Sequence, residues 1–279
     1  MTTNSTGKAS QAKLLPEMEA RAAAAREAVL AQTDFLHAQF GKVESRWKSD
    51  GTRVTAADIA ISEGVFAFLG ARFPEDQFFS EELNDSGSPI EVRSRFAWIL
   101  DPIDGTNNFA LGIPHCAIAL ALVDNGIPVY GAIYDLSRRV LMHGGPAFGA
   151  WNGDHPCRVS TTEPRRESLI GFHSPYDKAL VEGAKGVLSQ FKIRGLGSAT
   201  LHLAYVAAGL LDGAIDYNVK IWDLAAAIPL CEAAGGEVRF LNGPQLPIRQ
   251  FNLRMSRIIY VAGCPGMCDQ LAKLTGKVS

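Results

Sequence analysis

The sequence lacks a surplus of positive charge. Among its 279 residues, 27 are lysine or arginine and 29 are aspartate or glutamate, which gives a formal net charge of −2. Proteins dedicated to nucleic acids usually carry a basic face that neutralises phosphates. The composition therefore argues against nucleic acid as a partner.

Long apolar stretches are also absent. The longest runs, such as residues 116 to 123, are much shorter than the roughly 20 residues that span a bilayer. The first residues, MTTNSTGKASQAK, contain no apolar segment of the secretory type, so we expect residues 1 to 11 to be a disordered lead-in. These features predict a protein that does not associate with membranes.

Cysteine is scarce, with 5 residues in an odd count and without the spacing of a disulfide framework. Such usage fits a reducing compartment, and we expect a cytoplasmic protein. Cys264 and Cys268 form a C-x3-C pair, but no second Cys/His pair completes a metal-ligand set. The remaining composition, 47% hydrophobic and 20% charged, is that of a globular protein with one large or two moderate domains.

The first half of the chain predicts two helices and an antiparallel sheet, an α+β arrangement. Apolar residues at helical spacing indicate one amphipathic helix over residues 12 to 40, ended by Gly41. Thr55-Ala-Ala-Asp58 is typical of a capping box and begins a helix that ends near Gly70. Strands are predicted at residues 78–80, 96–100, 116–123, 129–134 and 139–143, with turns at 49–51, 125–126 and 149–153.

After Thr161 the predicted strands and helices alternate, which is typical of an α/β domain. Strands are predicted at residues 168–172, 192–196, 213–216, 237–240 and 258–262, and helices at 177–190, 198–210, 223–234 and 266–274. We therefore expect an N-terminal domain over residues 12 to 155, with most of the candidate metal ligands, and a C-terminal domain over residues 156 to 279.

Several acidic residues lie where an apolar segment ends, rather than on charged stretches. These are Glu81, Asp101, Asp104 and Asp223. Buried carboxylates are costly unless they are paired, and basic residues are scarce in these segments. A hard divalent cation would remove the conflict, and ligands that offer only oxygen favour Mg²⁺ over zinc. The alternative for any one of them is a helix cap, but all four together favour a metal site.

Gly105-Thr106 adds an anion site beside these carboxylates. Amides at a helix N-terminus, with a glycine that permits close approach, bind phosphate readily. Carboxylates for metals next to such amides suggest phosphoester hydrolysis by a metal-activated water. A covalent aspartyl-phosphate enzyme is the alternative, although Pro102-Ile103 places one residue too many between Asp101 and Asp104 for a D-x-D motif.

Several stretches resemble the inositol monophosphatase family of lithium-sensitive phosphatases. Residues 101–109, D-P-I-D-G-T-N-N-F, are similar to its D-P-[IL]-D-G-T-x-N-F signature, and residues 221–226, I-W-D-L-A-A, to its W-D-x-A-A/G signature. Shorter similarities lie at residues 48–58, 80–82 and 232–236. The resemblance extends from about residue 15 to the end of the chain. It implies a layered α-β-α-β-α sandwich, of the inositol monophosphatase and fructose-1,6-bisphosphatase type, and commonly a homodimer.

The resemblance also implies roles for single residues. Glu81, Asp101 and the Ile103 carbonyl would bind one Mg²⁺, and Asp101, Asp104 and Asp223 would bind a second. A third, weaker Mg²⁺ would lie near Glu81. Glu81 is also counted among the catalytic residues. Thr106, paired with Asp58, would orient the nucleophilic water. The Gly105 and Thr106 amides would hold the phosphate, and Gly197, Ser198, Ala199 and Asp216 would contact the rest of the substrate. Asp58 is thus either a helix cap or a catalytic partner.

Departures from the family pattern leave the substrate open. Asn107 replaces the usual threonine, and Ser80 and Ser198 stand where glycine and threonine are common. The resemblance implies a small phosphorylated metabolite, with myo-inositol 1-phosphate first. Histidinol phosphate, fructose 1,6-bisphosphate and 3′-phosphoadenosine 5′-phosphate are alternatives. A regulatory, RNA-associated protein that retains the phosphatase fold is a separate hypothesis.

Overall fold

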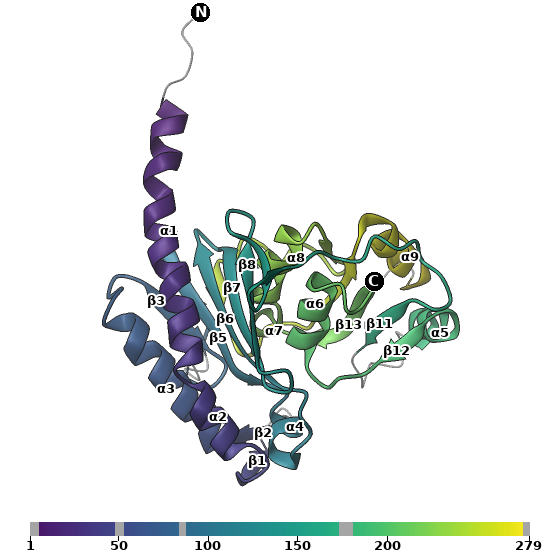
Figure 1. The fold of residues 1–279 in the computed structure, drawn as a ribbon, viewed down its shortest axis with the longest axis horizontal. Helices are drawn as coiled ribbons and strands as arrows, with labels where there is room; N and C mark the ends of the chain where they lie inside the picture. Colours follow the sequence, from purple (N-terminus) through teal and green to yellow (C-terminus); the bar gives the residue numbers. More distant parts are fainter. Residues whose placement is uncertain (1–5, 48–52, 84–87, 173–180, 276–279) are drawn as a thin grey trace, which may run out of the picture.

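The computed structural model describes residues 6–47, 53–83, 88–172 and 181–275. Layers of helices alternate with two sheets, in the order α-β-α-β-α (Figure 1). The first helical layer holds α1 (Thr6–Leu30), α2 (Thr33–Gln39) and α3 (Ala56–Gly70). The middle layer holds α6 (Ala199–Ala207), α7 (Ile221–Ala225) and α8 (Ala227–Ala233). The last helical layer holds α5 (Val181–Gln190) and α9 (Pro265–Thr275). The expected layered sandwich is confirmed.

The first sheet has seven strands in the order β10-β9-β8-β7-β6-β5-β3. They are β3 (Gln77–Ser80), β5 (Phe96–Asp104), β6 (Ala117–Asp124), β7 (Ile127–Asp135), β8 (Val140–Gly145), β9 (Gly149–Asn152) and β10 (His155–Pro156). All pairings are antiparallel except β3 with β5. The predicted hairpin at Asn125-Gly126 is confirmed, because both residues have the positive φ of a tight hairpin turn.

The second sheet has five strands in the order β12-β11-β13-β16-β14. They are β11 (Leu169–Phe172), β12 (Lys192–Arg194), β13 (Gly213–Val219), β14 (Glu237–Phe240) and β16 (Ile258–Gly263). Strand β11 pairs in parallel with β12 and β13, whereas β16 pairs antiparallel with β13 and β14. The expected alternation of strands and helices therefore builds a mixed sheet.

Two short ladders complete the fold. Strand β1 (Ser45–Trp47) pairs antiparallel with β2 (Arg53–Thr55), as the predicted hairpin requires, while its expected turn at residues 49–51 lies outside the described residues. Strand β4 (Ile90–Glu91) pairs with β15 (Gln250–Phe251), a ladder that no sequence pattern indicates.

Several predicted elements differ from the structure. Helix α1 includes residues 6 to 11, in place of the disordered lead-in expected there; residues 1 to 5 are not described. The single helix over residues 12 to 40 is wrong, because α1 ends at Leu30, whose carbonyl accepts a hydrogen bond from the Thr33 hydroxyl at 2.9 Å. The turn predicted at 149–153 is mostly strand β9.

The helix predicted over residues 223 to 234 is also divided. Pro229 has no N–H to donate to the carbonyl of Ala225, so the helix is interrupted at Ala226 and becomes α7 and α8. Among the described residues, no helix is long and apolar enough to cross a bilayer.

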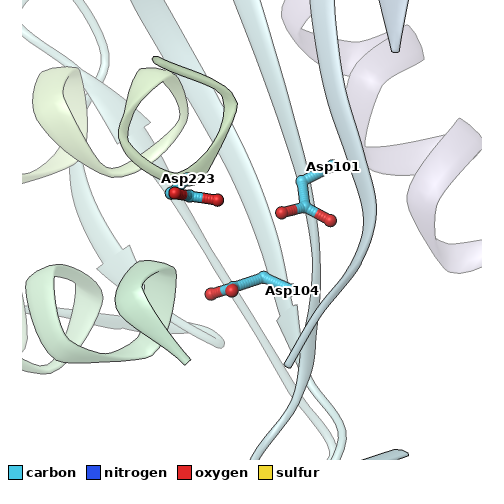
Figure 2. A group of neighbouring side chains, drawn as sticks. All are labelled: Asp101, Asp104 and Asp223. Atoms are coloured by element: carbon cyan, nitrogen blue, oxygen red, sulfur yellow. The ribbon is translucent and has the colours of Figure 1, made fainter. Parts of the chain in front are cut away.

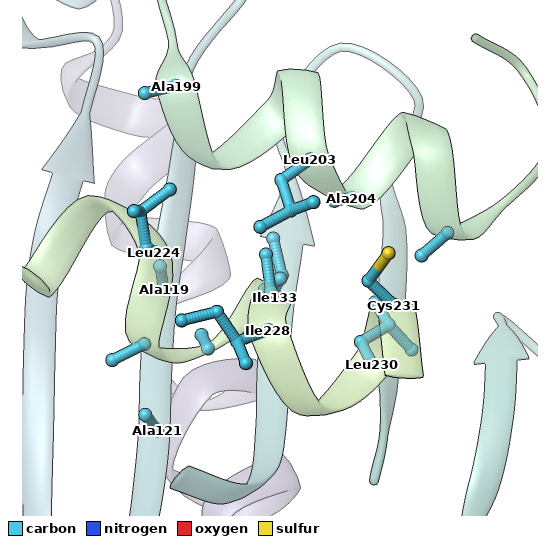
Figure 3. Packing of buried hydrophobic residues seen from close by; sticks show 14 of the residues in the cluster. Ala119, Ala121, Ile133, Ala199, Leu203, Ala204, Leu224, Ile228, Leu230 and Cys231 are labelled. Atoms are coloured by element: carbon cyan, nitrogen blue, oxygen red, sulfur yellow. The ribbon is translucent and has the colours of Figure 1, made fainter. Parts of the chain in front are cut away.

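The middle helices pack between the two sheets and share one hydrophobic cluster with both. Figure 3 shows Ala119 and Ile133 of the first sheet beside Leu224 and Ile228 of the middle layer. The contact is close, since a Cβ on Gly131 of β7 would lie 1.8 Å from the Ala226 carbonyl oxygen. The chain leaves the first sheet after β10, near the expected domain boundary. This shared core nevertheless packs α7 against β5 and β6 and α8 against β7, and so brings residues of the two halves together.

Candidate metal and phosphate site

Strand β5 delivers two carboxylates at its carboxyl end. All nine of its residues are buried, and its register against β6 shifts between Asp101 and Asp104. The Ile103 amide donates a hydrogen bond to Asp101 Oδ1 at 3.1 Å, which closes a turn through Pro102. Because of this irregularity, both aspartates leave the strand on the same side and lie close together.

Asp223 joins them from α7. Its Oδ2 accepts a hydrogen bond from the Lys220 amide at 2.7 Å, which caps the helix. One carboxylate oxygen from each of Asp101, Asp104 and Asp223 lies within 4.8 Å of the others (Figure 2). The structure therefore unites three of the four acidic residues predicted as metal ligands, although Asp223 follows the other two by more than a hundred residues.

These carboxylates repel one another. Burial raises the pKa of Asp101 well above its usual range, and the charges of Glu81 and Asp104 raise it further. Burial likewise raises the pKa of Asp223, with the charge of Asp104 as the next cause. Within the described part of the chain, no lysine or arginine forms an ion pair with any of the three. Their arrangement fits a bound divalent cation, which would supply the missing positive charge.

Glu81 lies next to this group without belonging to its tightest set. Strand β3 pairs in parallel with β5, with Ser80 opposite Leu100, and the Glu81 amide donates to the Leu100 carbonyl at 3.3 Å. Glu81 therefore follows β3 at the sheet edge where Asp101 follows Leu100. Its half-buried carboxylate is close enough to raise the pKa of both Asp101 and Asp223.

The second oxygen of Asp104 is bound by the N-terminus of α6. Asp104 Oδ2 accepts hydrogen bonds from the Ser198 hydroxyl and the Thr200 amide, both at 2.6 Å. Ser198 and Ala199 are buried, whereas Gly197 is exposed. Of the three residues predicted to contact substrate here, Ser198 thus uses its hydroxyl to orient Asp104, and Gly197 is the one with an open surface.

Gly105 and Thr106 form the turn between β5 and α4 (Thr106–Leu111). Gly105 has a φ of 89°, and a Cβ there would lie 2.8 Å from the His115 carbonyl oxygen, so only glycine suits the position. The Thr106 hydroxyl lies 3.0 Å from the Ile103 carbonyl oxygen and 3.4 Å from Asp58 Oδ1. The predicted approach of Thr106 to Asp58 is present.

Asp58 contributes to both structures proposed for it. Its Oδ2 accepts from the Thr55 amide at 2.8 Å and from the Thr55 hydroxyl at 2.6 Å, which forms the capping box of α3. Its Oδ1 faces Thr106. The two interpretations left open by the sequence are therefore compatible, since each uses a different oxygen of one buried carboxylate.

Asp216 lies inside the protein. It is 0% exposed, and its Oδ2 faces the Tyr260 hydroxyl at 3.0 Å and His202 Nδ1 at 3.4 Å. One oxygen of its carboxylate therefore contacts protein groups, and its contact with substrate stays a prediction. Sequence reasoning also overlooked Asn108, although it belongs to the D-P-I-D-G-T-N-N-F stretch, and His202, which no motif singles out.

The profile of the inositol monophosphatase family matches residues 14–273. The chain belongs to this family. It is 35% identical over 219 residues to an inositol-1-monophosphatase of Mesorhizobium japonicum, covering 75% of this chain and 81% of that protein. It is 30% identical over 207 residues to a Nus factor SuhB of Pasteurella multocida, covering 72% and 76%. The structure of the extragenic suppressor protein suhB from Bartonella henselae superposes with a TM-score of 0.80 at 28% identity, covering 92% of this chain and 98% of that one.

Membership in the inositol monophosphatase family makes the chain a phosphoric monoester hydrolase. The family is metal-dependent and acts on small phosphorylated compounds, in agreement with the acidic cluster. The expectation that the chain belongs to this family of phosphatases, drawn from the two sequence signatures, is confirmed.

Proposed function

We propose that this chain is a Mg²⁺-dependent phosphomonoesterase that hydrolyses a small phosphorylated polyol by direct attack of water. Myo-inositol 1-phosphate is the first candidate substrate. The observation that carries the proposal is the cluster of Asp101, Asp104 and Asp223, which has no cationic partner in the described residues and lies one turn from Gly105-Thr106.

Glu81, Asp101, Asp104, Asp223 and the Ile103 carbonyl are the proposed ligands of two or three Mg²⁺ ions. When bound, Mg²⁺ would lower the pKa of a coordinated water and offset the negative charge of the phosphate. The protein holds the ligands ready, because Asp101, Asp104 and Asp223 each receive a hydrogen bond on one oxygen from the backbone. Only small rearrangements of the side chains are then needed for binding.

Thr106 is proposed to orient the attacking water. Its hydroxyl has one proton, which it can donate to Asp58 or to the Ile103 carbonyl but not to both at once. In either case the Thr106 hydroxyl oxygen keeps a lone pair that can accept a hydrogen bond from the water. This hydrogen bond would turn the lone pair of the water oxygen toward phosphorus. The Gly105 and Thr106 amides, at the start of α4, would hold the phosphate oxygens.

The alcohol portion of the substrate would lie toward the exposed Gly197 and the exposed Asn107. Because Asp216 is buried, its carboxylate is not proposed to contact a polyol directly. Histidinol phosphate, fructose 1,6-bisphosphate and 3′-phosphoadenosine 5′-phosphate are the alternative esters, since the same metal and phosphate groups would serve each of them.

Phosphate release from a panel of these esters, with Mg²⁺ and with a chelator, tests the proposal. We expect Mg²⁺-dependent turnover that is fastest with myo-inositol 1-phosphate and is inhibited by millimolar Li⁺. Inversion of configuration at an isotopically chiral phosphorus would support direct attack by water, whereas retention would indicate the aspartyl-phosphate alternative. Absence of turnover with every ester at millimolar Mg²⁺ would refute the proposal.

A second candidate function is a regulatory one, suggested by the relative named Nus factor SuhB. It predicts that the tagged protein binds purified RNA polymerase, and that binding survives Asp223→Asn. The net charge of −2 gives no positive support for RNA binding, so we rank this function second.

A further inference from the structure

The peptide unit of Leu196 is held from both of its sides. Asn108 Nδ2, from α4, donates a hydrogen bond to the Leu196 carbonyl at 2.8 Å. The Leu196 amide donates to Nε2 of His202, from α6, at 3.0 Å. The two helices belong to different halves of the chain, so this peptide links the phosphate turn to the segment that leads into α6.

The linked segment lies against the proposed phosphate site. A Cβ on Gly105 would lie 3.2 Å from the Gly197 carbonyl oxygen, and a Cβ on Gly197 would lie 2.7 Å from Asn108 Nδ2. Asn108 is itself fixed, because Nδ2 also donates to the His115 carbonyl at 2.8 Å. The position of the exposed Gly197 relative to Gly105 therefore depends on how firmly Leu196 is held.

The hydrogen bonds define the state of the His202 ring. Because the Leu196 amide donates to Nε2, that nitrogen carries no proton, and the ring proton is on Nδ1. Nδ1 faces Asp216 Oδ2 at 3.4 Å, and the Tyr260 hydroxyl donates to the same oxygen at 3.0 Å. A neutral imidazole thus connects the half-buried Leu196 peptide to a buried carboxylate.

The ring has little room to move. His202 is 0% exposed, and a Cβ on Gly171 of β11 would lie 3.0 Å from its Cβ and Cγ. Asp216 Oδ1 is buried and has no hydrogen-bond partner among the described residues, so within this part of the chain the carboxylate is held by its contacts through Oδ2. An apolar substitution of His202 would weaken the support of this charge as well as release Leu196, and a milder change is needed to separate the two effects.

We infer that His202 is a positioning residue that, together with Asn108, clamps the Leu196 peptide and so sets the distance between Gly197 and the phosphate-binding turn. This inference deepens the proposed function, on which it rests. The clamp would place the alcohol portion of the substrate without touching the reacting atoms. Its loss should therefore weaken substrate binding more than it slows the chemical step.

Two substitutions of His202 by amide side chains test the contacts of Nε2 and of Nδ1 separately. In His202→Gln the side-chain oxygen reaches the place of Nε2 and can still accept from the Leu196 amide. In His202→Asn the shorter amide reaches only the place of Nδ1, so it can serve Asp216 but leaves the Leu196 amide without its acceptor. Both variants are uncharged and polar, which makes each the control for the other.

We expect His202→Asn to raise KM about tenfold with kcat within about threefold of the parent, because one buried hydrogen bond is lost. KM of His202→Gln should stay within about threefold. Asn108→Ala should raise KM as well, and combined with His202→Asn it should add less than its separate effect, because both act on one peptide. Equal KM values for the two His202 variants, or a loss confined to kcat, would overturn the inference.

Hydrogen exchange of the Leu196 amide gives a readout that does not need turnover. In the full-length protein without substrate, exchange at Leu196 should be about tenfold faster in His202→Asn than in the parent, and close to the parent rate in His202→Gln. Unchanged exchange in His202→Asn would overturn the clamp even if the enzyme is active. An inactive parent protein would refute the proposed function instead, so the two failures are distinguishable.

Discussion

Two regions of the molecule bury aspartate in opposite ways. Asp76, beside the first helical layer, accepts hydrogen bonds from Arg21 Nε at 2.9 Å, from the terminal nitrogen of Arg21 at 2.8 Å and from Trp98 Nε1 at 2.9 Å. The Arg21 guanidinium also lies over the rings of Phe73 and Phe96, at 4.6 and 4.0 Å from their centroids. Asp101 and Asp104 are similarly buried and Asp223 is half-buried, but these three carboxylates face one another.

In the first region the chain itself supplies the positive charge that pairs with a buried carboxylate. In the second region it supplies none among the described residues, and a bound cation is the proposed partner. Asp76 is 8% exposed and Asp104 is 8% exposed, so burial alone does not distinguish them. What distinguishes them is the partner: a bidentate arginine in one case, other carboxylates in the other. Like charges kept together in a fold cost free energy unless a cation binds there or a proton is taken up, which makes the cluster the candidate functional region.

The largest effect is expected from Asp101→Asn. The amide keeps the hydrogen bond from the Ile103 N–H but removes a charge from the proposed metal site, so turnover should fall by about a thousandfold or more. The same change relieves repulsion in the metal-free protein. We therefore expect the free energy of unfolding in chelator to increase by about 1 kcal/mol or more, since one pKa unit corresponds to about 1.4 kcal/mol.

Steady-state turnover and urea unfolding measure the two effects of Asp101→Asn. The matched control is Asp76→Asn, which should lower stability and leave the turnover of the folded fraction near the parent value. If Asp101→Asn retained near-parental turnover, or destabilised the metal-free protein as Asp76→Asn does, the contrast between the regions would be broken.

The next effect is on stability alone. Arg21→Met removes the bidentate partner and leaves Asp76 buried with only the Trp98 hydrogen bond, which should cost about 3 to 5 kcal/mol of the free energy of unfolding. Arg95 is the control, because its pair with Asp124 at 3.1 Å is partly exposed and Arg95→Met should cost about 1 kcal/mol or less. Denaturant unfolding checks both values. Similar costs for the two arginines would show that Asp76 is not specially dependent on its pairing.

The sequence predicted the positions of the strands better than the contacts between side chains of distant segments. Strong local patterns located β5, β6 and β7, and the D-P-I-D-G-T-N-N-F stretch identified two of the three clustered aspartates. Contacts between distant segments have no local pattern. The pair of Arg21 and Asp76 is 55 residues apart in the chain, and the bond from Asn108 to Leu196 spans 88 residues.

The direction in which a side chain points is also not predicted by a sequence motif. Ser198 and Asp216 lie in the segments where substrate contacts were expected, yet both direct polar atoms into the protein, toward Asp104 and toward Tyr260. A motif gives the position of a residue along the chain, but the packing of α6 and β13 decides which way its side chain points. Such details follow only from the assembled layers.

The pH dependence of stability sharpens the contrast further. The pKa of Asp101 is raised in the folded protein, so above the ordinary carboxyl pKa of about 4 the unfolded chain has released a proton that the folded chain retains. Stability of the metal-free protein is then lost as pH rises through this window. Because an asparagine side chain cannot titrate, the stability difference between Asp101→Asn and the parent should grow from about pH 4 to about pH 7. Chemical unfolding in chelator at several pH values measures it, and a difference that is constant or shrinks would contradict the assignment.

The smallest effect concerns Asp58, whose two oxygens have different surroundings. One oxygen is bound within the capping box of α3, and the other faces Thr106 in the proposed active site. Thr55→Ala removes the hydroxyl that bonds Asp58 Oδ2 at 2.6 Å and accepts from the Ala57 amide at 3.2 Å. It leaves the bond from the Thr55 amide to Oδ2 and the approach of Oδ1 to Thr106 in place. Loss of such a cap should lower the free energy of unfolding by about 1 kcal/mol, with turnover within about threefold of the parent. Asp58→Asn should instead slow turnover more than about tenfold, because an amide has only one acceptor oxygen and, while that oxygen accepts from Thr55, its NH2 group faces the Thr106 hydroxyl. Thermal unfolding and kcat of the two variants decide the point: if Thr55→Ala slowed turnover as much as Asp58→Asn, the cap and the catalytic contact would not be separable functions of the two oxygens.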